Sequence, residues 1–182
     1  MKTRLSVEDW VDAALHVMSD EGIGAVKIQR LCDELGVTKG SFYWHFRDLD
    51  AFLDTVAQRW RDGEGTLRSR WDEAVRADPK AAMKDAATVF LDRRLGRLER
   101  AMRDWSRTDE RARTAIKTAD KRAFDAIVDG FRMLGFDRTA ADVRAKILFY
   151  AGVGFGDVGP IGDRTAPERQ LSTLVELLTR AD

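Results

Sequence analysis

The stretch from Gly36 to Arg47, which reads GVTKGSFYWHFR, constrains the fold of this chain more than any other. Gly36 suits the left-handed backbone that ends a helix, and the hydroxyl of Thr38 can accept a backbone N–H bond at the start of the next one. Phe42 and Phe46 are four residues apart, so that next helix can bury both on one face. Its polar and aromatic residues then lie on the other faces. This pattern is typical of the second helix of a helix-turn-helix, whose exposed side chains contact base edges in the DNA major groove.

Two further helices are predicted before this one. The first begins at Ser6, which forms a capping arrangement with the acidic residue three positions later, and it ends at Gly22 and Gly24. The second runs over about 27–35 and ends at Gly36. Three short helices within about 45 residues, the last two joined by a glycine-containing turn, form a helix-turn-helix domain.

The rest of the chain also favours helices, because apolar residues keep recurring at helical spacing. We predict a helix over 48–76 that Gly63 and Gly65 kink or split. The further helices begin at Pro79, near Leu95, near Thr108, at a cap on Thr139 and at Pro167, and the one capped by Thr139 runs into a glycine-rich end at 152–162. The predicted fold is all-α, with a helix-turn-helix domain over 1–47 and a helical domain over 48–182.

Composition gives only a mild argument against nucleic-acid binding. The chain has 182 residues with 31 basic and 31 acidic side chains, whereas DNA-binding domains often carry a basic excess. Within 27–47 the basic residues are Lys27, Arg30, Lys39 and Arg47, against Asp33 and Glu34. The positive charge is therefore local, and we expect modest affinity from phosphate neutralisation.

We expect a cytoplasmic protein without a membrane span. Cys32 is the single cysteine, so no disulfide can form within one chain, which fits a reducing compartment. The first residues lack the apolar core of a signal peptide, and the sequence has no run of 18 apolar residues.

No catalytic, metal or cofactor site is predicted. His16 and His45 have no partner at metal-ligand spacing, and Cys32 lies on the apolar face of its helix. The glycines from 152 to 159 lack the Gly-Lys-Ser/Thr ending of a phosphate loop, so we interpret them as a helix end and a loop. No nucleophile and base form a recognisable constellation, and an enzyme is therefore the least favoured class.

With these residues in view, the N-terminal third resembles the TetR family of transcriptional regulators. The resemblance covers about residues 5–60 and depends on LC at 31–32, LGV at 35–37 and KGSFYWHF at 39–46. It implies an all-helical homodimer with an N-terminal DNA-binding domain and a C-terminal ligand-binding and dimerisation domain. The implied partners are double-stranded DNA carrying a palindromic operator and an unidentified small-molecule inducer.

The resemblance also assigns roles to residues of the recognition helix. Lys39, Gly40 and Ser41 would face base edges, whereas Thr38, Tyr43 and His45 would bind phosphates; Trp44 would lie between these two roles. The full predicted DNA-binding set is Lys27, Gln29, Thr38, Lys39, Gly40, Ser41, Tyr43, Trp44, His45 and Arg47.

The chain departs from the family pattern at two positions. Members usually carry Ser or Thr near position 27, where this chain has Lys27 and so loses a cap. They also carry lysine three residues after the phenylalanine that ends the recognition helix, where this chain has Leu49 followed by Asp50. Arg47 is the cation that could compensate.

Two further sites are implied for the C-terminal domain. The residues predicted to bind a ligand are Met83, Phe90, Arg94, Trp105, Asp120, Phe124 and Phe149. For any single aromatic residue, packing in an ordinary helical core is the favoured interpretation. The residues predicted to form the dimer interface are Ile147, Tyr150, Ala151, Gly154, Leu171, Leu174 and Leu178.

The sequence therefore predicts a one-component regulator, a repressor released from its operator by a ligand, although activation fits the same residues. The alternative is a ligand-binding or protein-interaction module that has weakened or lost DNA binding. Leu49, Asp50 and the zero net charge motivate that alternative.

Overall fold

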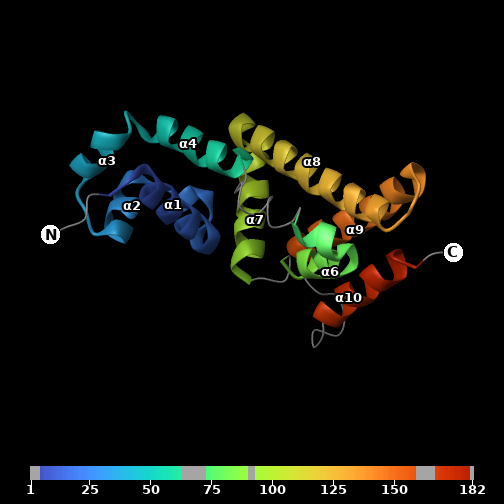
Figure 1. Cartoon of the computed structure of the whole chain (residues 1–182). Helices are drawn as coiled ribbons and strands as arrows, with labels where there is room; N and C mark the ends of the chain where they lie inside the picture. The colour runs from blue at the N-terminus through green and yellow to red at the C-terminus, as the bar shows by residue number, and fades with distance from the viewer. Residues whose placement is uncertain (1–4, 63–72, 90–92, 159–166, 181–182) are drawn as a thin grey trace. The chain divides into compact units, whose positions relative to one another are not determined.

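The computed structural model describes residues 5–62, 73–89, 93–158 and 167–180, with the side chains at 86–95 and 167–168 excepted. Every long element in these ranges is an α-helix, and Figure 1 shows their order along the chain. The helices are α1 (Val7–Glu21), α2 (Ile28–Leu35), α3 (Lys39–His45), α4 (Leu49–Asp62), α6 (Pro79–Val89), α7 (Arg93–Ser106), α8 (Glu110–Met133), α9 (Arg138–Val158) and α10 (Pro167–Leu178). A short 3₁₀ turn, η1, spans Ile23–Ala25, and residues 73–77 are also helical. None of the described helices is long and apolar enough to cross a membrane.

The chain divides into two compact units. The first contains Met1–Asp62 and Arg97–Lys117, and the second contains Gly63–Gly96 and Thr118–Asp182. The first unit therefore joins the three N-terminal helices and α4 to most of α7 and the start of α8. The predicted division at residue 47 concerns which part touches DNA, and it stays a prediction.

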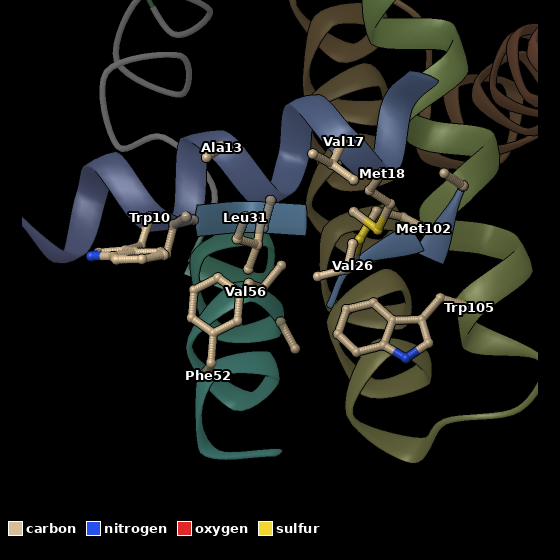
Figure 2. Packing of buried hydrophobic residues seen from close by; sticks show 14 of the residues in the cluster. Trp10, Ala13, Val17, Met18, Val26, Leu31, Phe52, Val56, Met102 and Trp105 are labelled. Carbon is tan, nitrogen blue, oxygen red and sulfur yellow. The ribbon is translucent and has the colours of Figure 1, made fainter. Parts of the chain in front are cut away.

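The first unit is held together by one apolar core. Trp10, Leu31 and Phe42 are fully buried in it, and they come from three different helices. Figure 2 shows this cluster, in which Met102 and Trp105 of α7 also take part. Burying each such large side chain contributes roughly 1.5–3 kcal/mol, so the short helices of this unit depend on packing rather than on their own propensity.

Local signals fix the start of α1 and the end of α2 as predicted. Ser6 and Asp9 form a complete capping box, in which each side chain bonds the backbone N–H of the other residue. Gly36 ends α2 in the left-handed region, with φ of 64°. The turn between α2 and α3 is therefore set by a residue that adopts this conformation without strain.

The second unit has its own core, in which Met83, Phe131 and Val175 are fully buried. Lys84 of α6 pairs with Glu176 of α10 at 2.7 Å. Arg144 of α9 lies 4.2 Å from the centre of the Phe136 ring and donates a hydrogen bond to the Leu178 carbonyl. These contacts join the helices of the second unit to one another.

Two sequence expectations about helix ends, the caps on Thr139 and Thr38, need correction. The cap of α9 is Asp137, whose carboxylate accepts the Ala140 N–H at 2.8 Å, so Thr139 is already inside the helix. The glycine-rich stretch is helical as far as Val158, within the range predicted for the helix end, and the predicted loop beyond it lies outside the described residues. Thr38 does occupy the N-cap of α3, but its hydroxyl makes no capping hydrogen bond. The predicted break at Gly63 and Gly65 falls outside the described residues.

Candidate nucleic-acid interface

One face of α3 is anchored in the core of the first unit. The Phe42 ring lies 5.3 Å from Trp10 in a T-shaped contact and 5.6 Å from Phe52 of α4. Phe46, which follows α3, lies 4.8 Å from Phe52. Edge-to-face contacts of this kind add to the stabilisation from burial. They fix the rotation of α3, so the identity of its outward face follows from the position of its phenylalanines.

The outward face of α3 carries large side chains that the fold does not bury. Tyr43 is 56% exposed and Trp44 is 64% exposed, while Lys39 is also exposed. Ser41 and His45 are half-buried at the edges of this face. Neighbouring exposed aromatic side chains form an apolar patch, and such patches often mark an interaction site. The adjacent cation Lys39 fits the same interpretation.

Gly40 lies at the start of this outward face, where the fold leaves room for a side chain. A Cβ atom built there would meet only the Thr38 hydroxyl, at an ordinary contact distance of 3.7 Å. The backbone does not need glycine there either, since Gly40 is not among the positive-φ glycines. The fold of this chain would therefore accept a side chain at position 40, and neither packing nor backbone conformation explains why the residue is glycine.

Lys27 and Gln29 lie at the start of α2 and are both exposed. Lys27 is the N-cap residue and makes no side-chain capping bond, as its residue type predicts. The Gln29 amide donates to Asp33 at 2.8 Å within the same helix. Both side chains are accessible to a ligand, but Gln29 would have to exchange an existing bond.

Arg47 is a strongly exposed cation beside α3, with 82% of its side chain accessible. Its Nε donates to Asp48 at 2.7 Å. Asp48 in turn accepts the Ala51 N–H at 2.7 Å and thereby caps α4. The Ala51 N–H and the Arg47 guanidinium hold the pKa of Asp48 below its ordinary value.

Asp48 was absent from the predicted site, although an aspartate directly before a helix is a recognisable cap signal. The cap orients Arg47 and also neutralises part of its charge. Leu49 is half-buried against the core of the first unit. The position where lysine was expected thus serves packing in this chain.

The predicted ligand-binding residues fall into different places. Met83 is fully buried in the second core, where Phe124 and Phe149 form a T-shaped pair at 6.2 Å and Asp120 is half-buried nearby in sequence. Trp105 belongs to the core of the first unit. Phe90 and the side chain of Arg94 lie outside the described residues.

A groove of about 640 Å³ exists in the described part of the second unit. Its lining includes Met133 and Phe136 together with the cationic residues Arg76, Arg132 and Arg138. None of the predicted ligand-binding residues that the structure describes lines it. Among the described side chains, no group of three His, Cys, Asp or Glu residues is placed to hold a metal ion.

The predicted dimer residues on α9 are largely at the surface. Ile147 is 47% exposed and Tyr150 is 67% exposed, while Ala151 and Gly154 are half-buried. On α10 the residues turn inward: Leu171 is fully buried in the second core, and Leu174 and Leu178 are half-buried against it.

The N-terminal region is similar to known regulators in sequence. A family model described as "Bacterial regulatory proteins, tetR family" matches residues 11–56, which include all ten predicted DNA-binding residues. The HTH-type transcriptional regulator AcrR of Shigella flexneri is 24% identical over 82 residues, which cover 45% of this chain. The tetracycline repressor protein class D of Escherichia coli is 35% identical over 54 residues, which cover 30% of this chain. The matches span only 38% and 25% of the lengths of these two relatives.

Solved structures extend the similarity of fold to nearly the whole chain. A transcriptional regulator from Rhodococcus sp. Rha1 has a TM-score of 0.76 and 19% identity, with 96% of each chain covered. The regulator FadR from Bacillus subtilis, solved with stearoyl-CoA, has a TM-score of 0.65 and 15% identity, with 96% of this chain and 98% of that chain covered. At such identities the likeness concerns the fold alone.

Proposed function

Since residues 11–56 of this chain belong to the tetR family of bacterial regulatory proteins, we propose that the protein is a DNA-binding transcriptional regulator rather than an enzyme. The observation that carries the proposal is the outward face of α3. Its core-facing phenylalanines are fully packed, yet Lys39, Tyr43 and Trp44 remain exposed. A recognition helix needs this combination, because one face must be held firmly in the core while the other face presents side chains that can bind DNA.

The chemistry of the exposed residues fits duplex DNA. Lys39 can donate to guanine O6 and N7, and Ser41 can bond several bases. Tyr43, His45 and Thr38 suit phosphate oxygens, which fix the register of a protein on DNA without reading its sequence. Arg47 adds a cation, although its bond to Asp48 reduces the charge it can offer. The site of action is the compartment that holds bacterial DNA, the cytoplasm.

Two copies of the chain are part of this proposal. The exposed apolar residues of α9 recur at helical spacing, at Val143, Ile147, Tyr150 and Val158. We name these four residues the α9 stripe. A stripe of this kind suits an isologous contact with the same helix of a second copy. A two-fold dimer would then present two recognition helices to the half-sites of a palindrome.

A small-molecule ligand that releases the DNA completes the proposed regulator. The support is the separate core of the second unit and the FadR neighbour, whose structure holds stearoyl-CoA. A ligand that binds one conformation of the dimer better than another shifts the population toward that conformation. Repression follows where the operator overlaps a promoter.

A selection from random DNA tests the proposal. Purified protein is used to enrich duplexes, and the affinity of the enriched duplex is measured by fluorescence anisotropy across a range of salt concentrations. We expect affinity to fall steeply with salt, because phosphate contacts release counterions. Lys39→Ala should weaken binding about tenfold or more, since a good base contact contributes about 1–3 kcal/mol. Tyr43→Ala should also weaken binding, through the loss of a phosphate contact.

Lys117→Ala is the matched control, because Lys117 is an exposed lysine on α8 outside the recognition face. It should leave affinity almost unchanged. Failure of the wild-type protein to enrich any duplex at low salt would reject DNA binding and favour the alternative of an interaction module.

A further inference from the structure

Arg111, in the first turn of α8, is the centre of an ionic cluster that reaches the start of α4. Its Nη1 lies 2.9 Å from the Asp50 carboxylate and 3.2 Å from the Asp54 carboxylate. The same Nη1 donates to the backbone carbonyl of Asp50 at 2.9 Å. Its Nη2 and Nε bond the two oxygens of Asp109 at 2.8 and 3.1 Å. All four residues belong to the first unit, and we name them the Arg111 cluster.

The cluster is more buried and more fully hydrogen-bonded than an ordinary surface ion pair. The Arg111 side chain is 27% exposed and that of Asp109 is 19% exposed. Asp109 also accepts the backbone N–H of Arg111 at 2.9 Å, which caps α8. Bidentate bonds from a guanidinium add geometric precision that a lysine cannot supply. The side chain is therefore held on one side by the cap of its own helix and presents its remaining donors to α4.

The location of the cluster connects it to α3. Asp50 is the second residue of α4, and the chain between α3 and α4 is only Phe46, Arg47 and Asp48. Phe46 packs on Phe52 one turn into α4. A shift in the first turn of α4 would therefore act on the C-terminal end of α3 through both the short connection and the aromatic contact.

Electrostatics point in the same direction. Three carboxylates surround one guanidinium, and Asp50 and Asp54 are 74% and 60% exposed. Without Arg111 these aspartates would repel one another and would present uncompensated negative charge beside the recognition helix.

We propose that Arg111 is a positioning residue for DNA recognition: it clamps the first turn of α4, and through it α3, in the orientation that reads the duplex. This inference rests on the proposed function. It assigns a role in reading DNA to a residue of α8 that lies outside the helix-turn-helix. Arg111 acts through α4 and need not touch DNA itself.

The test compares four variants on the duplex enriched by the wild-type protein and on an unrelated duplex of equal length. Arg111→Ala removes the clamp and one positive charge. Arg111→Ala/Asp54→Asn removes the clamp but restores the wild-type net charge. Arg111→Lys keeps the charge without the fork of donors. Arg113→Ala is the matched control, because Arg113 is a neighbouring arginine of α8 that pairs with Glu110 in the same helix.

A positioning role gives a pattern that charge alone does not. Arg111→Ala should lose about tenfold or more in affinity for the enriched duplex and much less for the unrelated one, because misplacing α3 affects base contacts more than phosphate contacts. The charge-restored double variant should remain weak, Arg111→Lys should recover part of the affinity, and Arg113→Ala should resemble the wild type. Equal losses on both duplexes, or full recovery in the double variant, would overturn the proposal.

Hydrogen exchange on the DNA-free protein tests the clamp separately. Arg111→Ala should speed amide exchange in the first turns of α4 and the last turn of α3, whereas exchange in α1 should stay as in the wild type. Unchanged exchange at α4 would overturn the clamp. If the wild-type protein enriches no DNA but exchange at α4 does increase, DNA binding has failed while the clamp remains.

Discussion

At the scale of single residues, the first unit contains two classes of side chain: those buried in its core, which the fold needs, and those left accessible to a ligand. Trp10 and Phe42 are fully buried, and a change at either must disturb the core. Gly40, Tyr43 and Trp44 lie on the same short segment, yet they contribute little to packing. Substitutions on the two sides of α3 should therefore give opposite signatures, one in stability and one in binding.

Gly40→Ala gives the sharpest form of this separation. Because a Cβ at position 40 makes only an ordinary contact with the Thr38 hydroxyl, and because alanine favours a helix over glycine by up to about 1 kcal/mol, we expect the free energy of unfolding to stay the same or rise. DNA affinity should fall, since the added methyl group holds the backbone away from the duplex. Urea unfolding and anisotropy titration measure the two effects. A stable variant that binds DNA as well as the wild type would contradict the assigned role of Gly40.

Trp10 should show the opposite signature. Its ring packs edge-on against Phe42 and its indole Nε1 has no hydrogen-bond partner in the described part of the chain. Trp10→Ala should lower the free energy of unfolding by about 3–5 kcal/mol. Trp10→Phe should cost much less, because it keeps an apolar ring and removes the unsatisfied donor. Urea unfolding checks the ranking, and equal losses in the two variants would be inconsistent with this packing.

At the scale of helices, the ends are controlled by single polar groups and single glycines. Ser6 and Asp9 begin α1, Asp48 begins α4, and Gly36 ends α2. Such groups act on the four backbone N–H or C=O groups that every helix end leaves unpaired. A change at one of them alters the geometry between neighbouring helices without touching the core.

Gly36→Ala should strain the turn of the helix-turn-helix. With φ of 64° at this position, a Cβ atom costs about 1–2 kcal/mol, and that amount should appear as lost stability in urea unfolding. Gly24→Ala is the control, because a Cβ there also meets open space but the backbone is not in the left-handed region. A similar loss in both variants would mean that backbone strain at Gly36 is not the cause.

The start of α8 should be sensitive to acid. Hydrogen bonding from Arg111 lowers the pKa of Asp109 to about 2, from an ordinary value of 3.8. As pH falls, the unfolded chain therefore protonates Asp109 before the folded protein does. The stabilisation that the Asp109 carboxylate gives the folded protein is complete above about pH 4 and is lost as pH falls toward 2. Asp109→Asn should flatten the pH dependence of the unfolding free energy in this window. An Asp109→Asn variant with the same pH dependence as the wild type would contradict this assignment.

The sequence predicted the elements whose causes are local. The capping box at Ser6, the left-handed Gly36 and the buried face of α3 all depend on residues within a few positions of one another. Thr139 was the wrong cap because two acceptable capping residues stand close together, and a pattern does not decide between Asp137 and Thr139. The Arg111 cluster joins residues about sixty positions apart, and no local signal announces such a contact.

At the scale of the whole molecule, the α9 stripe is an apolar surface that the described part of the chain leaves exposed. Val143, Ile147, Tyr150 and Val158 are each close to half exposed or more. Leu171, although predicted for the same interface, already serves the core of its own chain. The stripe on α9 is therefore the better place to disturb association.

Ile147→Asp should convert a dimer into a monomer. A carboxylate placed on each side of a two-fold contact would be desolvated and would face its own symmetry mate, which costs several kcal/mol. Light scattering after size-exclusion chromatography measures the mass. Ala123→Asp, which adds the same charge at an exposed position of α8, should not change it. A wild-type protein that is already monomeric at micromolar concentration would reject the proposed dimer.

The α9 stripe also bears on how sharply such a regulator responds to its own abundance. If its apolar residues join two chains only weakly, most copies are single at low concentration, and the number of pairs grows with the square of the number of chains. Doubling synthesis would then raise the DNA-competent form about fourfold. The length and polarity of this one exposed helix face would set the threshold at which a cell's supply of the protein begins to occupy its target.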